Sequence, residues 1–174
     1  AGVGKPGGSP TQRLVHWLVD TFAKKADLWL DIHGGTRTET IASYLWAWET
    51  GVLEIDSDVR KFIIAHTPKF GIFERQLLPV GKAATLARAG CGYIQGESGG
   101  SGPRQENDIL HHETWIMAAL GFMGIMGPAN PSRRTRPVIY QNVDYIRCKK
   151  SGLWFQSDTT IRMVRKGETL GVIR

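Results

Sequence analysis

Apolar residues recur in two different periods along the first part of the chain. Leu14, Trp17 and Leu18 repeat at helical spacing, which predicts a helix over this region. A near-continuous apolar run then covers residues 28–32, the pattern of a strand buried on both faces. A helix that leads directly into such a strand is typical of an α/β layer.

The same alternation of helical and extended patterns continues to about residue 122. It predicts the following elements in chain order: a strand over 41–48, a helix over 56–66, a short helix over 81–89, a strand over 91–95 and a long helix over 106–122. Residues 70–79 look irregular or briefly extended. This order of elements predicts an α/β fold in which helices flank a sheet.

The pattern changes after Pro137, where short runs of extended character are separated by glycine turns. Such runs cover residues 138–147, 152–155, 161–164 and 170–173. Short strands at close spacing are typical of a small β-module. We therefore expect a first domain over residues 1–132 and a C-terminal β-module over residues 133–174.

Composition and charge narrow the class of protein. The 174 residues suffice for one ordinary domain, or one domain and a small appendage, and 41% hydrophobic with 22% charged residues is typical of a globular chain. The net charge of +6 is scattered, apart from Arg133-Arg134-Thr135-Arg136 and Lys149-Lys150. Two runs this short do not make a nucleic-acid footprint.

Three features that the sequence lacks indicate the cellular compartment of the protein. The longest apolar run, residues 116–126, is too short to cross a bilayer and contains two glycines. No signal peptide opens the sequence, and Cys91 and Cys148 lie far apart without the spacing of a metal-binding pair. We therefore expect a cytoplasmic protein with neither a membrane nor a nucleic-acid partner.

Candidate chemistry follows two of the expected strands. Asp31-Ile32-His33-Gly34-Gly35 ends the first, and Gly96-Glu97-Ser98-Gly99-Gly100 ends a later one. Ligands of open α/β sheets bind at such strand ends, so we expect the two segments to converge. His33 could then ligate a metal, with Asp31 orienting it and Glu97 acting as general base. A catalytic zinc takes three protein ligands, however, and no two others stand at convincing spacing.

Two alternatives remain open at this point. Gly96-Glu97-Ser98-Gly99-Gly100 matches the G-x-S-x-G motif of serine hydrolases, although that motif must turn directly into a helix. Residues 99–103 have the composition of a loop instead. A non-catalytic basic binding module would use the two basic runs to contact phosphates.

The chain resembles the succinylglutamate desuccinylase/aspartoacylase family, whose fold is zinc-carboxypeptidase-like, with a mixed sheet flanked by helices. Residues 31–35 resemble its Asp-Leu-His-Gly segment, in which the histidine is the third zinc ligand. Residues 97–100 are similar to its Glu-x-Gly-Gly segment, whose glutamate is the general base. Residues 8–14 resemble the helix start that follows its Asn-Arg motif. Residues 153–155 and 164–171 look like its C-terminal β-domain, which has a lipoyl-like character.

The chain also departs from the family pattern. The first two zinc ligands of the family come from a His-x-x-Glu motif, and neither this motif nor Asn-Arg precedes His33 here. We therefore expect a fragment of a longer family member with an incomplete β-module, and a degenerate complete protein is the alternative. By itself, this chain is expected to lack tightly bound zinc and hydrolase activity.

The resemblance implies a function for the parent protein. That function is zinc-dependent hydrolysis of N-acyl amino acids or related small amides, with Glu97 as the general base. Arg37, Arg88 and Arg104 are candidates to hold a substrate carboxylate through a bidentate contact. The identity of the acyl group and of the amine is left open, as is the oligomeric state, including a homo-oligomer.

Overall fold

The computed structural model describes residues 4–75, 81–102, 105–127, 136–157 and 162–174. The chain divides into two compact units, residues 1–142 and 143–174. Among the described residues, unit 1 contains all the helices and a five-stranded sheet, and unit 2 contains a two-stranded sheet. The expected α/β fold, with a mixed sheet flanked by helices and a small additional sheet, is confirmed.

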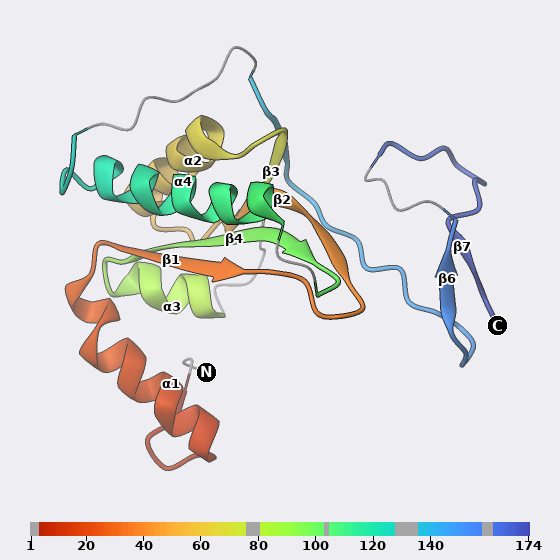
Figure 1. Cartoon of the computed structure of the whole chain (residues 1–174). Helices are drawn as coiled ribbons and strands as arrows, with labels where there is room; N and C mark the ends of the chain where they lie inside the picture. Colours follow the sequence, from red (N-terminus) through yellow and green to blue (C-terminus); the bar gives the residue numbers. More distant parts are fainter. Residues whose placement is uncertain (1–3, 76–80, 103–104, 128–135, 158–161) are drawn as a thin grey trace. The chain divides into compact units, whose positions relative to one another are not determined.

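The helices and strands of unit 1 are, in chain order, α1 (Pro10–Thr21), η1 (Ala23–Lys25), β1 (Leu28–His33), β2 (Thr40–Trp48), α2 (Leu53–His66), β3 (Phe70–Glu74), α3 (Lys82–Arg88), β4 (Gly92–Gly100), α4 (Glu106–Phe122) and β5 (Val138–Tyr140). They alternate along the chain from β2 to β5, whereas α1 and η1 precede β1 and β2 (Figure 1). The strands are arranged in the order β1-β4-β2-β3-β5. β4 runs parallel to β1 and antiparallel to β2, whereas β2, β3 and β5 are mutually parallel along the sheet.

Helices α2 and α4 cover one face of the sheet (Figure 1). The core between them and the strands includes Leu45, Phe62, Ile94 and Trp115, each fully excluded from solvent. Successive side chains of a strand point to opposite faces. Leu28, Leu30 and Ile32 of β1 therefore pack against this core, whereas Trp29, Asp31 and His33 point to the other face.

The opposite face is covered over part of its area by α3. Ala83 and Leu86 of α3 pack with Cys91 and Tyr93 in a second, smaller cluster. Beyond that cluster this face carries polar side chains of β1 and β4 as well as aromatic side chains of β2. Asp31, His33 and Glu97 therefore lie on the face away from the main core.

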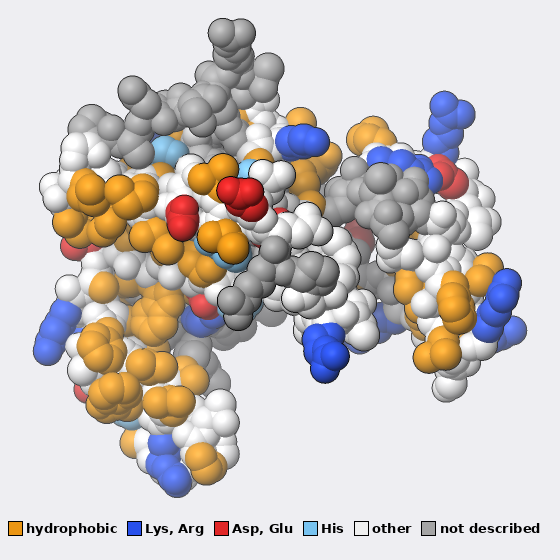
Figure 2. Space-filling model, in the orientation of Figure 1, with side chains coloured by type: hydrophobic (Ala, Val, Ile, Leu, Met, Phe, Trp, Pro, Cys, Tyr) orange, Lys and Arg blue, Asp and Glu red, His pale blue; other side chains and the backbone are white. Residues whose placement is uncertain are grey.

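Two helices expose apolar side chains that are not part of either core. On α1, Leu14 and Trp17 are about half exposed, and on α4, Leu110 and Met117 are similarly exposed. Figure 2 shows hydrophobic side chains gathered over these two helices. None of the described helices is long and apolar enough to cross a membrane.

The structure corrects several expected strands. Residues 70–74, within the stretch expected to be irregular or briefly extended, form the interior strand β3. Val138–Tyr140 pairs with β3 in the main sheet, whereas this stretch was expected to belong to the C-terminal module. β4 continues to Gly100 and does not end at residue 95.

Unit 2 consists of the antiparallel strands β6 (Trp154–Gln156) and β7 (Gly171–Ile173). Both lie within or beside stretches expected to be extended. The described residues of the run 161–164 form no strand. Most side chains of this unit are exposed, so little apolar area is buried within it.

Candidate functional site

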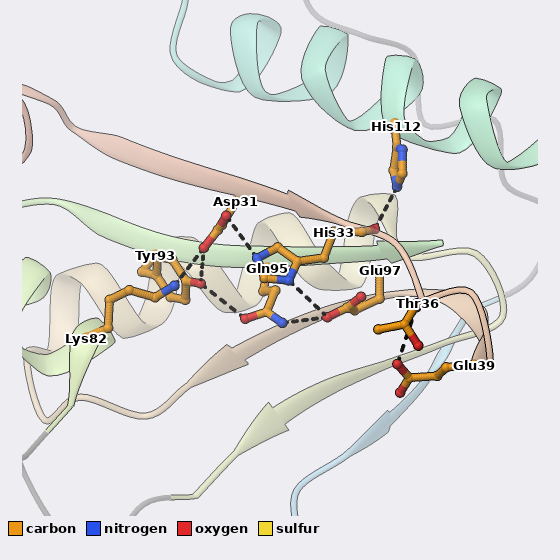
Figure 3. A network of polar contacts seen from close by, with 9 residues as sticks. All are labelled: Asp31, His33, Thr36, Glu39, Lys82, Tyr93, Gln95, Glu97 and His112. Carbon is orange, nitrogen blue, oxygen red and sulfur yellow. Dashed lines mark hydrogen bonds and ion pairs between the residues drawn. The ribbon is translucent and has the colours of Figure 1, made fainter. Parts of the chain in front are cut away.

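Parallel pairing of β1 with β4 brings the two predicted segments together. His33 is the pairing partner of Glu97, and Asp31 is the partner of Gln95. Because paired residues of parallel strands point to the same face, all four side chains lie on one side of the sheet. Figure 3 shows them converging on that face with Tyr93 and Lys82. The expected convergence of the two segments is therefore present: His33 is the last residue of β1, whereas Glu97 lies inside β4.

The imidazole of His33 lies between two carboxylates. Its Nε2 is 3.1 Å from Oδ1 of Asp31, and its Nδ1 is 3.7 Å from Oε1 of Glu97. The first distance is that of a hydrogen bond, and the second is longer than one. Nε2 is therefore placed to donate to Asp31, and Nδ1 is the ring nitrogen on the Glu97 side. The His33 side chain is 44% exposed.

Glu97 is buried, and its two carboxylate oxygens differ in their surroundings. The side chain is only 8% exposed. Oε1 accepts a hydrogen bond from Nε2 of Gln95 at 2.5 Å. Oε2 has no hydrogen-bond partner among the described residues, although it is shielded from solvent. A buried acceptor without a partner costs about 1–3 kcal/mol, more when charged, and is the kind of strain that functional sites retain.

Asp31 is held by two donors from other elements. Nζ of Lys82 lies 2.6 Å from Oδ2, and the Tyr93 hydroxyl donates to the same oxygen at 2.7 Å. Burial by itself would raise the pKa of the Asp31 carboxyl, but the hydrogen bonds from Lys82 and Tyr93 outweigh it and lower that pKa. Burial and the hydrogen bond to Asp31 raise the pKa of Tyr93. At neutral pH, Asp31 is thus a carboxylate and Tyr93 a protonated donor.

Glycines allow the two site loops to approach each other closely. The backbone N–H of Gly35 donates to the carbonyl of Gly99 at 3.1 Å. A Cβ added to Gly100, whose φ is +140°, would lie 2.0 Å from the carbonyl oxygen of Glu39. Any side chain at this position would therefore separate the loop after β1 from the end of β4. The glycines that follow Glu97 thus serve loop packing beside the site.

Ser98 points to the opposite face of β4 from Glu97. The residue is only 3% exposed. Its hydroxyl oxygen lies 2.7 Å from the Ser43 hydroxyl oxygen, and the hydroxyl donates to Oδ1 of Asp108 at 3.0 Å. The strand continues through Gly100 without a sharp turn into a helix. This geometry does not favour the serine-hydrolase alternative, because that mechanism needs an exposed hydroxyl on a strand-to-helix turn.

The three candidate arginines are placed differently. Arg37 is exposed in the loop between β1 and β2, directly after His33. Arg88 ends α3 and lies next to the beginning of β4, whereas Glu97 is near the other end of that strand. This placement does not support a substrate contact for Arg88. Arg104 lies outside the described residues.

Sequence reasoning missed four residues of the site. Lys82, Tyr93 and Gln95 form the polar network just described, and Nε2 of His112 lies 3.1 Å from the backbone carbonyl oxygen of His33. The period-2 alternation of Tyr93, Gln95 and Glu97 was a usable signal, because such residues share a face of a strand. Lys82 and His112 carried no such signal, since each reaches the site from a separate helix.

Metal ligation by the described residues is limited to one candidate imidazole. They contain no group of three or more His, Cys, Asp or Glu side chains that could hold a metal ion. His33, with Nε2 bonded to Asp31, has the arrangement typical of a ligating histidine, in which the second ring nitrogen donates to a carboxylate. Among the described residues, His33 is therefore a candidate for a single metal ligand.

Comparison with known proteins gives matches among solved structures alone. No family model and no curated protein matches the sequence. The succinylglutamate desuccinylase/aspartoacylase from Rhodobacter sphaeroides is 21% identical with a TM-score of 0.80, and the match covers 98% of this chain and 53% of that one. A succinylglutamate desuccinylase from Silicibacter sp. TM1040 is 18% identical with a TM-score of 0.82, over 98% and 53% of the two chains.

A third similar structure is the product-bound ectoine utilization protein EutE (DoeB) from Ruegeria pomeroyi. It is 19% identical with a TM-score of 0.78, and the match covers 98% of this chain and 52% of that chain. The chain thus spans about half the length of the solved structures it matches. At these identities the likeness establishes the fold: the chain has the fold of the succinylglutamate desuccinylase/aspartoacylase structures.

Proposed function

We propose that the whole protein is a hydrolase that removes the acyl group from N-acylated amino acids or related small amides. The observation that carries the proposal is the pairing of His33 with Glu97, whose buried Oε2 has no hydrogen-bond partner in the described part of the chain. The names of the similar structures, succinylglutamate desuccinylase and aspartoacylase, support the same class of substrate.

Zinc is the proposed cofactor. The described residues fit zinc only in part. A catalytic zinc takes three protein ligands, and the described residues offer one, Nδ1 of His33. We propose that the other ligands belong to the part of the whole protein that this chain does not include. When bound, zinc would supply a water of lowered pKa and would polarise the amide carbonyl.

The residues of this chain then have defined tasks. Glu97 uses Oε2 to accept the proton of the attacking water and later transfers it to the leaving nitrogen. Asp31 accepts the Nε2–H of His33, which keeps Nδ1 free as a ligand and holds the ring in place. Lys82 and Tyr93 keep Asp31 ionised and fixed. Burial of Glu97 limits the approach of bulk water to the proton that it carries.

The substrate carboxylate needs a cationic partner in this scheme. Arg37 is the candidate that remains near the site, in the loop directly after β1. A bidentate contact from its guanidinium would favour acidic N-acyl amino acids over neutral ones. This assignment remains a prediction.

The test compares Glu97→Gln with wild type in the whole protein, using a panel of N-acyl amino acids. We expect Glu97→Gln to lower kcat by about 100- to 10,000-fold, because the proton acceptor is lost, while elemental analysis shows unchanged zinc. Glu54→Gln is the matched control, since Glu54 lies in the exposed first turn of α2. Substantial turnover by Glu97→Gln would reject Glu97 as the base. Loss of activity in Ser98→Ala, together with insensitivity to chelators, would instead support the serine-hydrolase alternative.

A further inference from the structure

We propose that Gln95 is a positioning residue for Glu97. Its amide holds one carboxylate oxygen and thereby leaves the other available to accept a proton. The inference rests on the proposed function, in which Glu97 is the general base. It concerns a residue that acts through Glu97 and that no sequence motif indicated.

The contact between the two side chains is short and directional. Nε2 of Gln95 donates to Oε1 of Glu97 at 2.5 Å, and the residues are two positions apart on the same face of β4. The amide must present its NH2 group here, since its oxygen would repel the carboxylate. The terminal torsion of a glutamate is broad and roughly two-fold, so an untethered carboxylate rotates easily. The hydrogen bond from Gln95 removes this freedom and distinguishes Oε1 from Oε2.

Among the described residues, His33 does not perform this task. Its Nδ1 lies 3.7 Å from Oε1 of Glu97, beyond hydrogen-bonding distance. Oε2 has no partner. The orientation of the Glu97 carboxylate therefore depends on Gln95.

Gln95 is in turn confined by Tyr93. The Tyr93 hydroxyl lies 3.1 Å from Oε1 of Gln95 and 2.7 Å from Oδ2 of Asp31 (Figure 3). It has one proton, and the charged Asp31 is the stronger acceptor. The Tyr93 ring is itself fixed, because it stacks on Trp48 with 5.7 Å between ring centroids and Nζ of Lys82 lies 4.3 Å from its centroid. Tyr93 thus acts mainly as a rigid neighbour of the amide, and its removal should matter less than removal of Gln95.

The kinetic test compares Gln95→Met and Tyr93→Phe with wild type in the whole protein. Methionine keeps the length of the glutamine and removes both amide atoms. We expect Gln95→Met to lower kcat by about 10-fold or more and to keep KM within about twofold of wild type, because the variant loses a hydrogen bond to a charged catalytic group. Tyr93→Phe should show a smaller loss. Gln156→Met is the matched control, because Gln156 is exposed on β6 of the other unit.

A second measurement does not depend on activity. In the NMR spectrum of protein labelled with ¹⁵N-glutamine, the side-chain NH2 signal of Gln95 is identified by its absence from Gln95→Met. This signal should shift strongly in Glu97→Ala and stay unchanged in the control Glu54→Ala. The positioning role would be overturned by an unchanged Gln95 signal in Glu97→Ala. It would also be overturned if Gln95→Met kept the wild-type kcat while Glu97→Gln was inactive. Either result would leave the proposed function intact. Full turnover by Glu97→Gln would instead overturn the proposed function. The NMR result would then still decide whether Gln95 holds the carboxylate.

Discussion

Thr67 joins the end of helix α2 to two strands of the sheet through its hydroxyl. The residue is fully buried, accepts a hydrogen bond from the backbone N–H of Leu45 at 3.1 Å and donates to the backbone carbonyl of Phe70. We expect Thr67→Val to destabilise unit 1 strongly, because valine has nearly the same shape but leaves both backbone groups without this partner. Each buried group left unsatisfied costs about 1–3 kcal/mol, so the expected loss for the two groups is about 2–6 kcal/mol.

Thr67→Ser provides the matched control. Serine keeps both hydrogen bonds and removes one methyl group, which costs about 1 kcal/mol. The Thr67 methyl packs close to Gly71, where an added Cβ would lie 3.1 Å from it, so a small loss of packing is expected. The order of stability should therefore be wild type, then Thr67→Ser, then Thr67→Val.

Urea unfolding followed by ellipticity at 222 nm measures this difference. The described helices all lie in unit 1, so the signal follows that unit. With a slope of about 2 kcal/mol per molar urea, Thr67→Val should lower the midpoint by about 1–3 M without changing the slope. A Thr67→Val midpoint equal to wild type would refute the reasoning, and so would a Thr67→Ser midpoint as low as that of Thr67→Val.

Two further predictions concern packing beside the site and the cysteines. Gly96→Ala should cost about 1–3 kcal/mol in urea unfolding, because the new Cβ would lie 2.8 Å from the buried ring of Trp115. Gly7→Ala, with open space around it, should be neutral, and equal effects would contradict this account. Burial raises the pKa of the Cys91 thiol from 9.0 to about 11. At pH 8.5, iodoacetamide should therefore modify exposed Cys148 and spare Cys91, as peptide mass spectrometry would detect; rapid native labelling of Cys91 would contradict this.

Much of the fold could be predicted because its signals are local. The apolar run at residues 28–32 and the helical spacing at residues 106–122 correspond to β1 and α4. The convergence of His33 and Glu97 was predictable in outline, since strands of an α/β sheet often run parallel and bring their ends to one edge. These inferences needed only periodicity and a general rule of topology.

The rest depends on pairing between distant segments. Val138–Tyr140 has an extended pattern, but nothing in three residues indicates whether they join a separate module or pair with β3. Strand preference reflects the neighbours that a strand acquires, and those are settled by the tertiary structure. The same limit applies to the site, where Lys82 reaches Asp31 from 51 positions away along the chain. The alternation of Gln95 with Glu97 indicated a shared face of a strand, but the hydrogen bond between their side chains could be identified only in the structure.

The pairing of β1 with β4 also has a consequence for how the protein folds. Tyr93 and Asp31, which are bonded across these strands, are 62 positions apart in sequence. β1 is at the edge of the described sheet, so β4 is its one neighbouring strand there. Closing so long a loop costs entropy before any contact is gained, and contacts of this range slow folding. The candidate site should therefore assemble late, and refolding experiments should recover helical signal before the His33–Glu97 pair forms.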